Sequence, residues 1–316
     1  MATKLTVIGN KKPVSPIMKF GMKHIVKPYQ LWLMLLPAIV VIFIFNYVPM
    51  YGIQLAFRDF VANKGLTGGP FVGMKYFNKF INSFQFWNLI RNTITLSGFS
   101  ILVGFPMPII LALMLNQIRN ERYKKILQTT IYFPHFISTV VMVGLIVVFL
   151  SPNTGVVGNL VNKLGYGKNL LGADTFVPVY VLSDVWQHAG WGSIIYLAAL
   201  SSVDTQLYDA CIIDGAKKWQ VIWHIDIPCL IPTIIILFVL SMGNILGVGF
   251  EKAFLMQNNL NLKASEIIQT YVYKIGITSN QYSYSAAIGV FNTAVNFIFL
   301  TGMNYLAKKV SHVSLW

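Results

Sequence analysis

The chain has 316 residues, of which 55% are hydrophobic and 11% are charged, and its formal net charge is +14 at pH 7. An average soluble domain carries about 25% charged residues, so this composition excludes a disordered chain and an ordinary water-soluble globule. Nucleic-acid binding is disfavoured too, because the basic residues flank apolar segments. We therefore predict a membrane protein with several spans.

Six stretches are long and apolar enough to cross a bilayer, for which a helix needs about 20 mainly apolar residues. They cover residues 31–56, 90–116, 127–150, 177–200, 229–250 and 286–307. The sequence predicts an all-α polytopic membrane protein with six transmembrane helices. Its predicted parts are a basic amino-terminal segment 1–30, a transmembrane domain 31–307 and a tail 308–316.

The distribution of basic residues predicts the orientation of the spans. The connections on one side, together with both termini, hold 14 of the 24 Lys and Arg residues, and the longer connections on the other side hold nine. The segments that hold the 14 basic residues are 1–30, 117–126, 201–228 and 308–316. Because dense basic segments face the cytoplasm, we expect both termini and the 201–228 connection on the cytoplasmic side.

Polar and aromatic side chains interrupt the apolar character of the last three spans. Side chains of this kind at membrane depth usually face a bundle interior or a wet cavity, although hydrogen bonding between helices is an equally good explanation for any one of them. The candidates for lining a path are Trp186, Gln187, Trp191, Asn244, Asn292 and Asn296.

The outer connections are short to medium in length and predict no separate domain. Residues 151–172 are rich in Gly and Asn, which is typical of turns. Residues 263–275 predict a short helix that Ser265 would cap.

Motifs of catalysis are absent from the sequence. It has no GxxxxGK[ST] phosphate loop, no HExxH zinc motif and no GxSxG nucleophile elbow. The five histidines lie in different segments without metal-ligand spacing. We predict no catalytic site, no metal site and no enzymatic activity on this chain.

The connection 201–228 has helical signals of its own. Asp204 is placed to cap a helix, and Gly215 is placed to end it, because glycine adopts the left-handed conformation without strain. A second amphipathic helix is predicted over 219–225, and Pro228 is expected to mark the return into the bilayer. Such a helix–Gly–helix elbow would suit a mechanical coupler or an interfacial anchor equally well.

The residues of this elbow carry a family resemblance. The segment YDACIIDGA at 208–216, followed by IDIP at 225–228, resembles the EAA loop of ABC importer permeases, with Asp209 in place of the usual Glu. The resemblance implies that the helix 204–216 contacts an ATPase. The residues to which it assigns this contact are Tyr208, Asp209, Ala210, Cys211, Asp214, Gly215, Ala216 and Pro228.

The similarity extends to GFPMPIILALMLN, YFPHFIS, GWGSIIYLAAL and YVYKIGI, and it covers residues 28–316. These segments resemble the permeases of carbohydrate ABC importers of the maltose type. The resemblance implies a type I importer permease fold in the bacterial cell membrane. Its implied partners are a second homologous permease, two ATP-binding subunits that carry ATP and Mg²⁺, and an extracytoplasmic sugar-binding protein. This chain would hold no cofactor.

An oligosaccharide substrate fits the polar residues of the spans, because sugars stack on aromatic rings and accept hydrogen bonds from amides. The predicted function is therefore a permease subunit of an ATP-driven oligosaccharide importer. The alternative is an ion-coupled secondary sugar carrier, which would need a membrane-buried carboxylate. Asp184 is the candidate for that role, but no internal repeat supports such a carrier.

Overall fold

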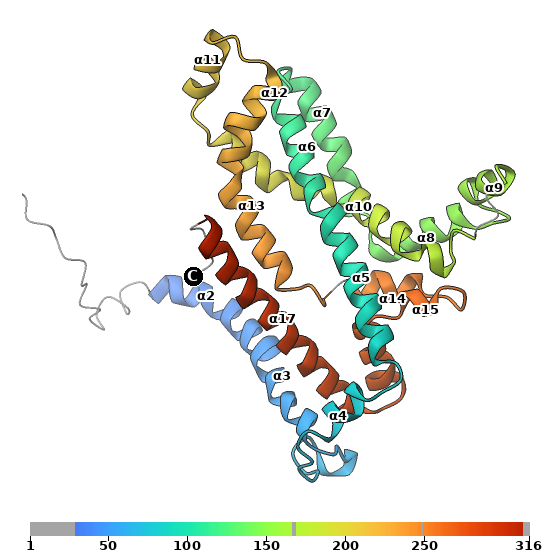
Figure 1. Ribbon diagram of the computed structural model, residues 1–316. Helices are drawn as coiled ribbons and strands as arrows, with labels where there is room; N and C mark the ends of the chain where they lie inside the picture. Colours follow the sequence, from blue (N-terminus) through green and yellow to red (C-terminus); the bar gives the residue numbers. More distant parts are fainter. Residues whose placement is uncertain (1–28, 166–168, 248, 312–316) are drawn as a thin grey trace, which may run out of the picture. The chain divides into compact units, whose positions relative to one another are not determined.

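A computed structural model describes residues 29–165, 169–247 and 249–311 (Figure 1). The described residues are almost entirely helical, and their one β-feature is an isolated bridge between Arg58 and Phe71. This confirms the predicted all-α class. Most of the predicted amino-terminal segment and the end of the predicted tail lie outside the described residues.

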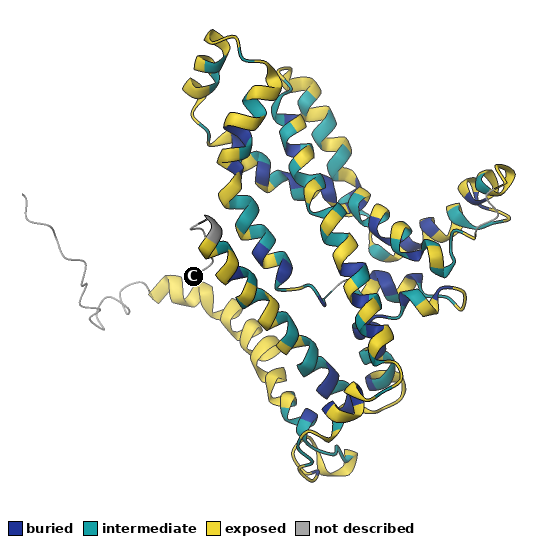
Figure 2. Cartoon of the chain, in the orientation of Figure 1, coloured by how far each residue is buried: buried dark blue, intermediate teal, exposed yellow. Residues whose placement is uncertain are grey.

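The chain divides into two units, Met1–Gly52 and Ile53–Trp316. In the first unit, α2 (Tyr29–Ile42) continues through a π-helical turn, η1 (Phe43–Tyr47), into α3 (Val48–Met50). All of its described side chains up to Met50 are exposed, and Figure 2 shows them in yellow. A helix that is apolar all round is stable in lipid and not in water. The helical stretch Tyr29–Phe57 is long and apolar enough to be the first span that the sequence predicts.

The second unit consists of helices joined by short connections. Its longer helices are α5 (Phe86–Gly104), α6 (Pro106–Asn116), α7 (Glu121–Tyr132), α8 (Thr139–Leu150), α10 (Ala173–Ser201), α13 (Ile227–Met242) and α17 (Tyr282–Ser311). The shorter helices are α4 (Lys75–Ile81), α9 (Val156–Lys163), α11 (Thr205–Ile213), α12 (Lys218–Val221), α14 (Phe250–Met256), α15 (Leu262–Ser265) and α16 (Ile268–Tyr273). The remaining turns are η2 (Tyr51–Phe57), η3 (Ala62–Lys64), η4 (Phe133–Phe136), η5 (Ile222–Asp226) and η6 (Lys274–Thr278).

Helix α10 packs against α5 and α6 and supplies much of the core. Two glycines of α10 allow its close packing, Gly190 against α7 and Gly192 against α6. A Cβ built on Gly190 would lie 2.0 Å from the Ile131 carbonyl oxygen, and one on Gly192 would lie 3.1 Å from the Pro108 ring. Small residues at helix crossings let backbones approach each other in membranes, where there is little hydrophobic force between helices.

Helices cover all six predicted spans. Four continuous helical segments of the described chain are long and apolar enough to cross a membrane, namely Tyr29–Phe57, Phe86–Asn116, Lys218–Met242 and Tyr282–Lys309. A bent pair, Glu121–Phe136 with Thr139–Leu150, would make a fifth. The predicted span 177–200 lies within α10, whose 29 residues reach about 44 Å at 1.5 Å per residue.

The third span differs from its prediction as one helix over 127–150. Helices α7 and α8 meet at an angle of 94°. Pro134 lies in the intervening 3-10 turn, where its missing N–H cannot continue an α-helix, and Ser138 starts α8 by accepting a hydrogen bond from the Val141 N–H at 3.3 Å.

The fifth span ends earlier than the predicted residue 250. Helix α13 stops at Met242 and is followed by a turn over residues 243–246. The Asn296 Oδ1 atom of α17 accepts a hydrogen bond from the Leu246 N–H at 2.9 Å, which satisfies a backbone donor of this break. Non-helical backbone at membrane depth is tolerated only where such partners or a wet cavity exist.

Candidate coupling helix and substrate path

Helix α11 (Thr205–Ile213) is defined at both ends by local hydrogen bonds. Asp204 Oδ1 accepts from the Gln206 N–H at 2.9 Å, which confirms the predicted cap. At the other end Gly215 has φ +72°, and two hydrogen bonds close a Schellman motif, from the Ala216 N–H to the Cys211 carbonyl at 2.9 Å and from the Gly215 N–H to the Ile212 carbonyl at 3.1 Å.

Most of α11 is exposed in this chain. The structure places Asp209, Ala210 and Asp214 in solvent, with Tyr208, Cys211 and Ala216 partly buried. Ile213 is 85% exposed and Ile212 is 60% exposed. Figure 2 shows the helix largely in yellow.

The second arm of the elbow differs from its prediction. The sequence predicts a separate surface helix over 219–225. In the structure α12, η5 and α13 instead form one continuous helix from Lys218 to Met242, with Pro228 in its interior. The N–H of Ile227 bonds to the Ile222 carbonyl, which gives a π-helical turn. Because Pro228 cannot donate to the carbonyl four residues earlier, this wider turn lets the helix continue.

The π-helical turn buries a carboxylate that the sequence prediction missed. Asp226 is 0% exposed. Its Oδ1 accepts from the Tyr208 hydroxyl at 2.7 Å and from Asn116 Nδ2 at 3.3 Å, and its Oδ2 accepts from Gln117 Nε2 at 2.9 Å. The signal in the sequence is an acid two residues before Pro228, at the start of an apolar run.

Tyr208 is the side chain through which α11 contacts this carboxylate. Its hydroxyl also accepts a hydrogen bond from Asn116 Nδ2 at 3.4 Å. Burial, together with the hydrogen bond to Asp226, raises the pKa of Tyr208 to about 12. The phenol therefore keeps its proton at neutral pH and remains a donor to Asp226.

Two of the predicted path residues are engaged in hydrogen bonds within the protein. Gln187 is 3% exposed and donates from Nε2 to the Ile137 carbonyl at 2.8 Å, at the break between α7 and α8. Asn296 accepts from Leu246 at the end of α13. Both side chains therefore satisfy backbone groups that broken helices leave free.

Asn244 lines a groove of about 600 Å³ between α5, α6, α10 and α13. Ser100, Asp184, His188 and Ser241 lie in the same groove. These groups offer hydroxyl, amide, imidazole and carboxylate partners beside apolar walls, which is the composition of a small-molecule site.

The Asp184 carboxylate pairs with a lysine that was not predicted. Its Oδ1 lies 3.2 Å from Nζ of Lys252, whose side chain is 5% exposed and which also donates to the Tyr180 carbonyl at 3.1 Å. His188 Nδ1 lies 3.4 Å from the same carboxylate oxygen. A charge at this depth usually has such a partner.

The other three predicted path residues lie apart from this groove. Trp186 lines a separate pocket beside α6 and α7, and Asn292 lines a third beside α16 and α17. Trp191 stacks on His135 with ring centroids 4.6 Å apart and an interplanar angle of 4°. In this single chain the six residues therefore do not converge on one cavity.

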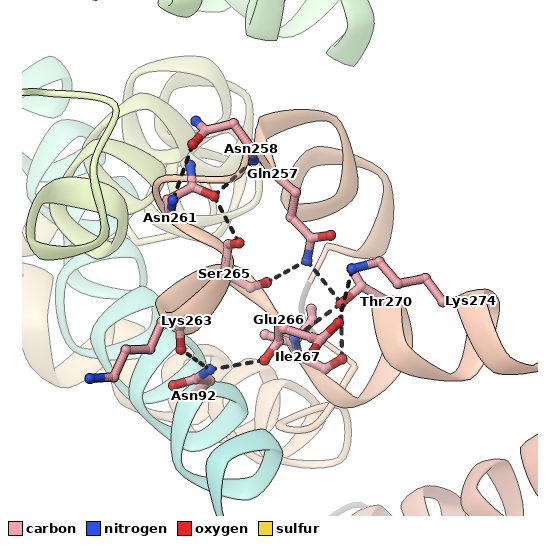
Figure 3. Close-up of polar contacts among 10 residues, drawn as sticks. All are labelled: Asn92, Gln257, Asn258, Asn261, Lys263, Ser265, Glu266, Ile267, Thr270 and Lys274. Atoms are coloured by element: carbon pink, nitrogen blue, oxygen red, sulfur yellow. Dashed lines mark hydrogen bonds and ion pairs between the residues drawn. The ribbon is translucent and has the colours of Figure 1, made fainter. Parts of the chain in front are cut away.

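A polar network surrounds α14, α15 and α16 (Figure 3). Asn92 donates from α5 to the carbonyls of Lys263 and Glu266 at 2.8 and 3.0 Å, and Gln257 donates to the Ser265 carbonyl at 2.9 Å. The predicted cap at Ser265 is wrong. Ser265 ends α15, and the Ile268 N–H at the start of α16 donates instead to Thr93 Oγ1 at 3.0 Å.

Among the described residues, no group of three or more His, Cys, Asp or Glu side chains is arranged to hold a metal ion.

Residues 104–312 match the family of binding-protein-dependent transport system inner membrane components. The chain belongs to this family. The match begins at the end of α5 and includes α11, α12, α13 and the Asp226 cluster, so the exposed helix and its buried carboxylate are parts of a transport permease.

Three relatives resemble this permease over most of their length. Protein LplB of Bacillus subtilis (strain 168) is 40% identical over 97% of this chain and 98% of its own. The polygalacturonan/rhamnogalacturonan transport system permease protein YteP of the same strain is 41% identical over 90% of both chains. A chain of a crystallised bacterial ABC transporter involved in the import of the acidic polysaccharide alginate is 40% identical, with a TM-score of 0.83 over 92% of this chain and 98% of that one. The permease thus has the type I importer fold that its sequence predicts.

Proposed function

We propose that this permease is a transmembrane subunit of an ATP-driven importer that moves an oligosaccharide into the cytoplasm. The observation that carries the proposal is α11, a capped and exposed helix that interrupts the path of the chain between two long helices. Motion of such a helix reaches both α10, which precedes it, and α13, which follows it.

The assembly we propose has two grounds. The sequence has no GxxxxGK[ST] phosphate loop, and the relatives are named as a transport system permease and a chain of an ABC transporter. Two ATPase subunits on separate chains bind ATP and Mg²⁺ and receive α11 at their surface. A second homologous permease completes the path, and an extracytoplasmic binding protein delivers the saccharide. One relative was crystallised with an alginate pentasaccharide-bound periplasmic protein, which supports the last of these partners.

The orientation in the membrane is part of the proposal. We place α11, both termini and the basic connection that precedes α7 in the cytoplasm, since Arg119, Arg122, Lys124 and Lys125 crowd that connection. The network around α14, α15 and α16 then lies on the outer side.

In this mechanism ATP supplies the free energy, because it binds one of the two conformations of the complex more tightly than the other and its hydrolysis reverses that preference. Closure of the ATPase pair on ATP pulls on α11, and α10 and α13 follow because they are joined to it by short connections. The groove lined by Asn244 and Ser241 is the first candidate for saccharide contact, because its amide and hydroxyl groups can bind sugar hydroxyls. Trp186, Trp191 and Asn292 remain candidates in the complete permease pair.

The test is uptake by proteoliposomes that contain the complete complex, with acidic and neutral oligosaccharides offered in parallel. We expect uptake to require ATP and the ATPase subunits, and uptake that persists without them would overturn the proposal. A sharper test is Gly215→Val. Because a Cβ at Gly215 would meet no atom within 4 Å, this substitution acts through its left-handed φ of +72°, at a cost of about 1–2 kcal/mol.

We expect Gly215→Val to release the ATPase subunits and to lower uptake, with normal insertion of the permease. Gly215→Asn is the conservative control, because Asn tolerates the left-handed conformation. Gly65→Val is the matched control elsewhere, since Gly65 also has a positive φ of 70° and open space around it. Equal uptake by the Gly215→Val and Gly65→Val complexes would count against α11 as the coupling element.

A further inference from the structure

Asp226 is a fully buried carboxylate at the point where three helical elements meet. Its hydrogen-bond donors come from the end of α6, through Asn116 and Gln117, and from the middle of α11, through Tyr208. Asp226 itself belongs to the helix that continues into α13. One carboxylate therefore joins the coupling helix to two helices of the transmembrane bundle.

Apart from the bonds of Tyr208 to Asp226 and to Asn116, which also bonds to Asp226, the hydrogen bonds of α11 shape the helix without fixing its direction. The Asp204 cap and the Schellman motif at Gly215 are bonds within the connection itself, and no residue of α11 is buried. A helix held only by such bonds could pivot about Gly215. The hydrogen bond from Tyr208 to Asp226, at 2.7 Å, opposes that pivoting.

The carboxylate is a costly choice for a purely structural contact. Burying a charged group demands that its hydrogen bonds be satisfied, and replacement by a packed apolar residue is often neutral or stabilising. What the carboxylate offers is directional bonding. It accepts from α11 on one oxygen and from Gln117 on the other, so that a displacement of α11 bears on α6 as well as on α13.

We propose that Asp226 is a positioning residue of transport, which fixes the direction of α11 and transmits its motion to α6 and α13. This inference rests on the proposed role of α11. The cluster also explains the π-helical turn, because η5 ends at Asp226 and turns this side chain toward Tyr208 and Gln117 within a helix that must also accommodate Pro228.

The experiment measures hydrogen exchange and thermal stability of the complete complex in lipid nanodiscs, and in proteoliposomes it measures the number of saccharide molecules moved per ATP hydrolysed. The variants are Tyr208→Phe and Asp226→Asn. In Tyr208→Phe the hydrogen bond to Asp226 is lost, and we expect exchange of the α11 amides to accelerate roughly tenfold. In Asp226→Asn the bond is weakened because its acceptor is neutral, and we expect a smaller acceleration in the same direction. We expect the number of saccharides moved per ATP to fall in both variants.

Two control variants lie on the neighbouring helix α7. Tyr123→Phe removes a hydroxyl from an exposed tyrosine, and Glu121→Gln removes the charge of an exposed carboxylate. We expect neither to change α11 exchange or the number of saccharides moved per ATP.

A rescue variant separates positioning from general stability. In Asp226→Asn the new Nδ2 faces Gln117 Nε2, so this pairing survives only if the Gln117 amide turns over to present Oε1 as the acceptor. Adding Gln117→Glu restores the pairing, because the new side chain accepts from the amide at 226 while Tyr208 still donates to the oxygen there. We expect the double variant to recover slow α11 exchange and most of the coupling.

Unchanged α11 exchange in Tyr208→Phe and Asp226→Asn would overturn the proposal, whatever happens to transport. Faster exchange with an unchanged number of saccharides per ATP would overturn the transmission role of Asp226. Retention of the ATPase subunits by Gly215→Val would instead overturn the coupling role of α11 itself, so the two failures are distinguishable.

Discussion

The connection that contains α11, which we place on the inner side, and the connection that contains α15 and α16, which we place on the outer side, are built in opposite ways. The bonds that shape α11 join residues close in sequence, and its apolar side chains remain exposed. In the outer connection, buried groups bond to residues far away in the chain, such as Ile268 to Thr93 and the Glu266 carbonyl to Asn92. The first region is therefore held mainly by local bonds and remains exposed, as the proposed contact with an ATPase requires, whereas the second is fixed by bonds within this chain.

The largest effect on stability should come from the outer connection. Thr93→Val keeps the side-chain shape but leaves the buried Ile268 N–H without an acceptor, since both residues are 0% exposed. We expect the free energy of unfolding to fall by about 1–3 kcal/mol. The measurement is chemical unfolding of the purified permease in detergent.

The matched control is Thr130→Val, an exposed threonine of α7 that bonds only to the carbonyl four residues earlier. We expect it to change stability by less than about 0.5 kcal/mol. Equal losses in the two variants would mean that the outer connection is no more firmly built than an exposed helix surface.

An intermediate effect should come from the cap of α11. Asp204→Ala removes the acceptor of the Gln206 N–H, and loss of such a cap costs about 1 kcal/mol of helix stability. Because α11 is exposed, we expect faster hydrogen exchange within α11 only, with an unchanged unfolding midpoint for the permease. Ser138→Ala, which removes the cap of α8, serves for comparison. A lower unfolding midpoint for Asp204→Ala would contradict the independence of α11.

The smallest effect concerns a surface ion pair in the outer loop before α4. Asp59 Oδ2 lies 2.9 Å from Lys75 Nζ, and Tyr76 donates a hydrogen bond to the same carboxylate. The hydrogen bonds from Lys75 and Tyr76 hold the pKa of Asp59 below its usual value. A depressed carboxyl pKa contributes stability above the unfolded pKa of about 3.9 and loses it as pH falls through the folded value.

We therefore expect protection factors for hydrogen exchange in residues 57–74 to be constant near neutral pH and to fall below about pH 4. Asp59→Asn should remove this acid dependence in the loop and leave α11 unchanged. An acid transition of equal size in Asp59→Asn would assign the effect to another group.

The sequence alone determined the class of the protein and the ends of α11, the helix that we propose for coupling. Apolar runs of about 20 residues can only be buried in lipid, and a cap at Asp204 or a left-handed glycine at 215 depends on neighbours within a few residues. These signals are local, so they could be interpreted without knowing the fold. The same locality explains why the family resemblance was carried by this connection.

Only the tertiary structure decided where the polar groups of the spans go. Gln187 and Asn296 satisfy backbone groups at broken helices, Thr93 caps a helix 175 residues away, and Asp226 collects donors from two other elements. A polar residue in an apolar run indicates that a partner exists without indicating which one, because the partner depends on how distant helices pack. The 94° bend between α7 and α8 and the uninterrupted helix through Pro228 were decided in the same way, by which neighbours satisfy the backbone that proline leaves free.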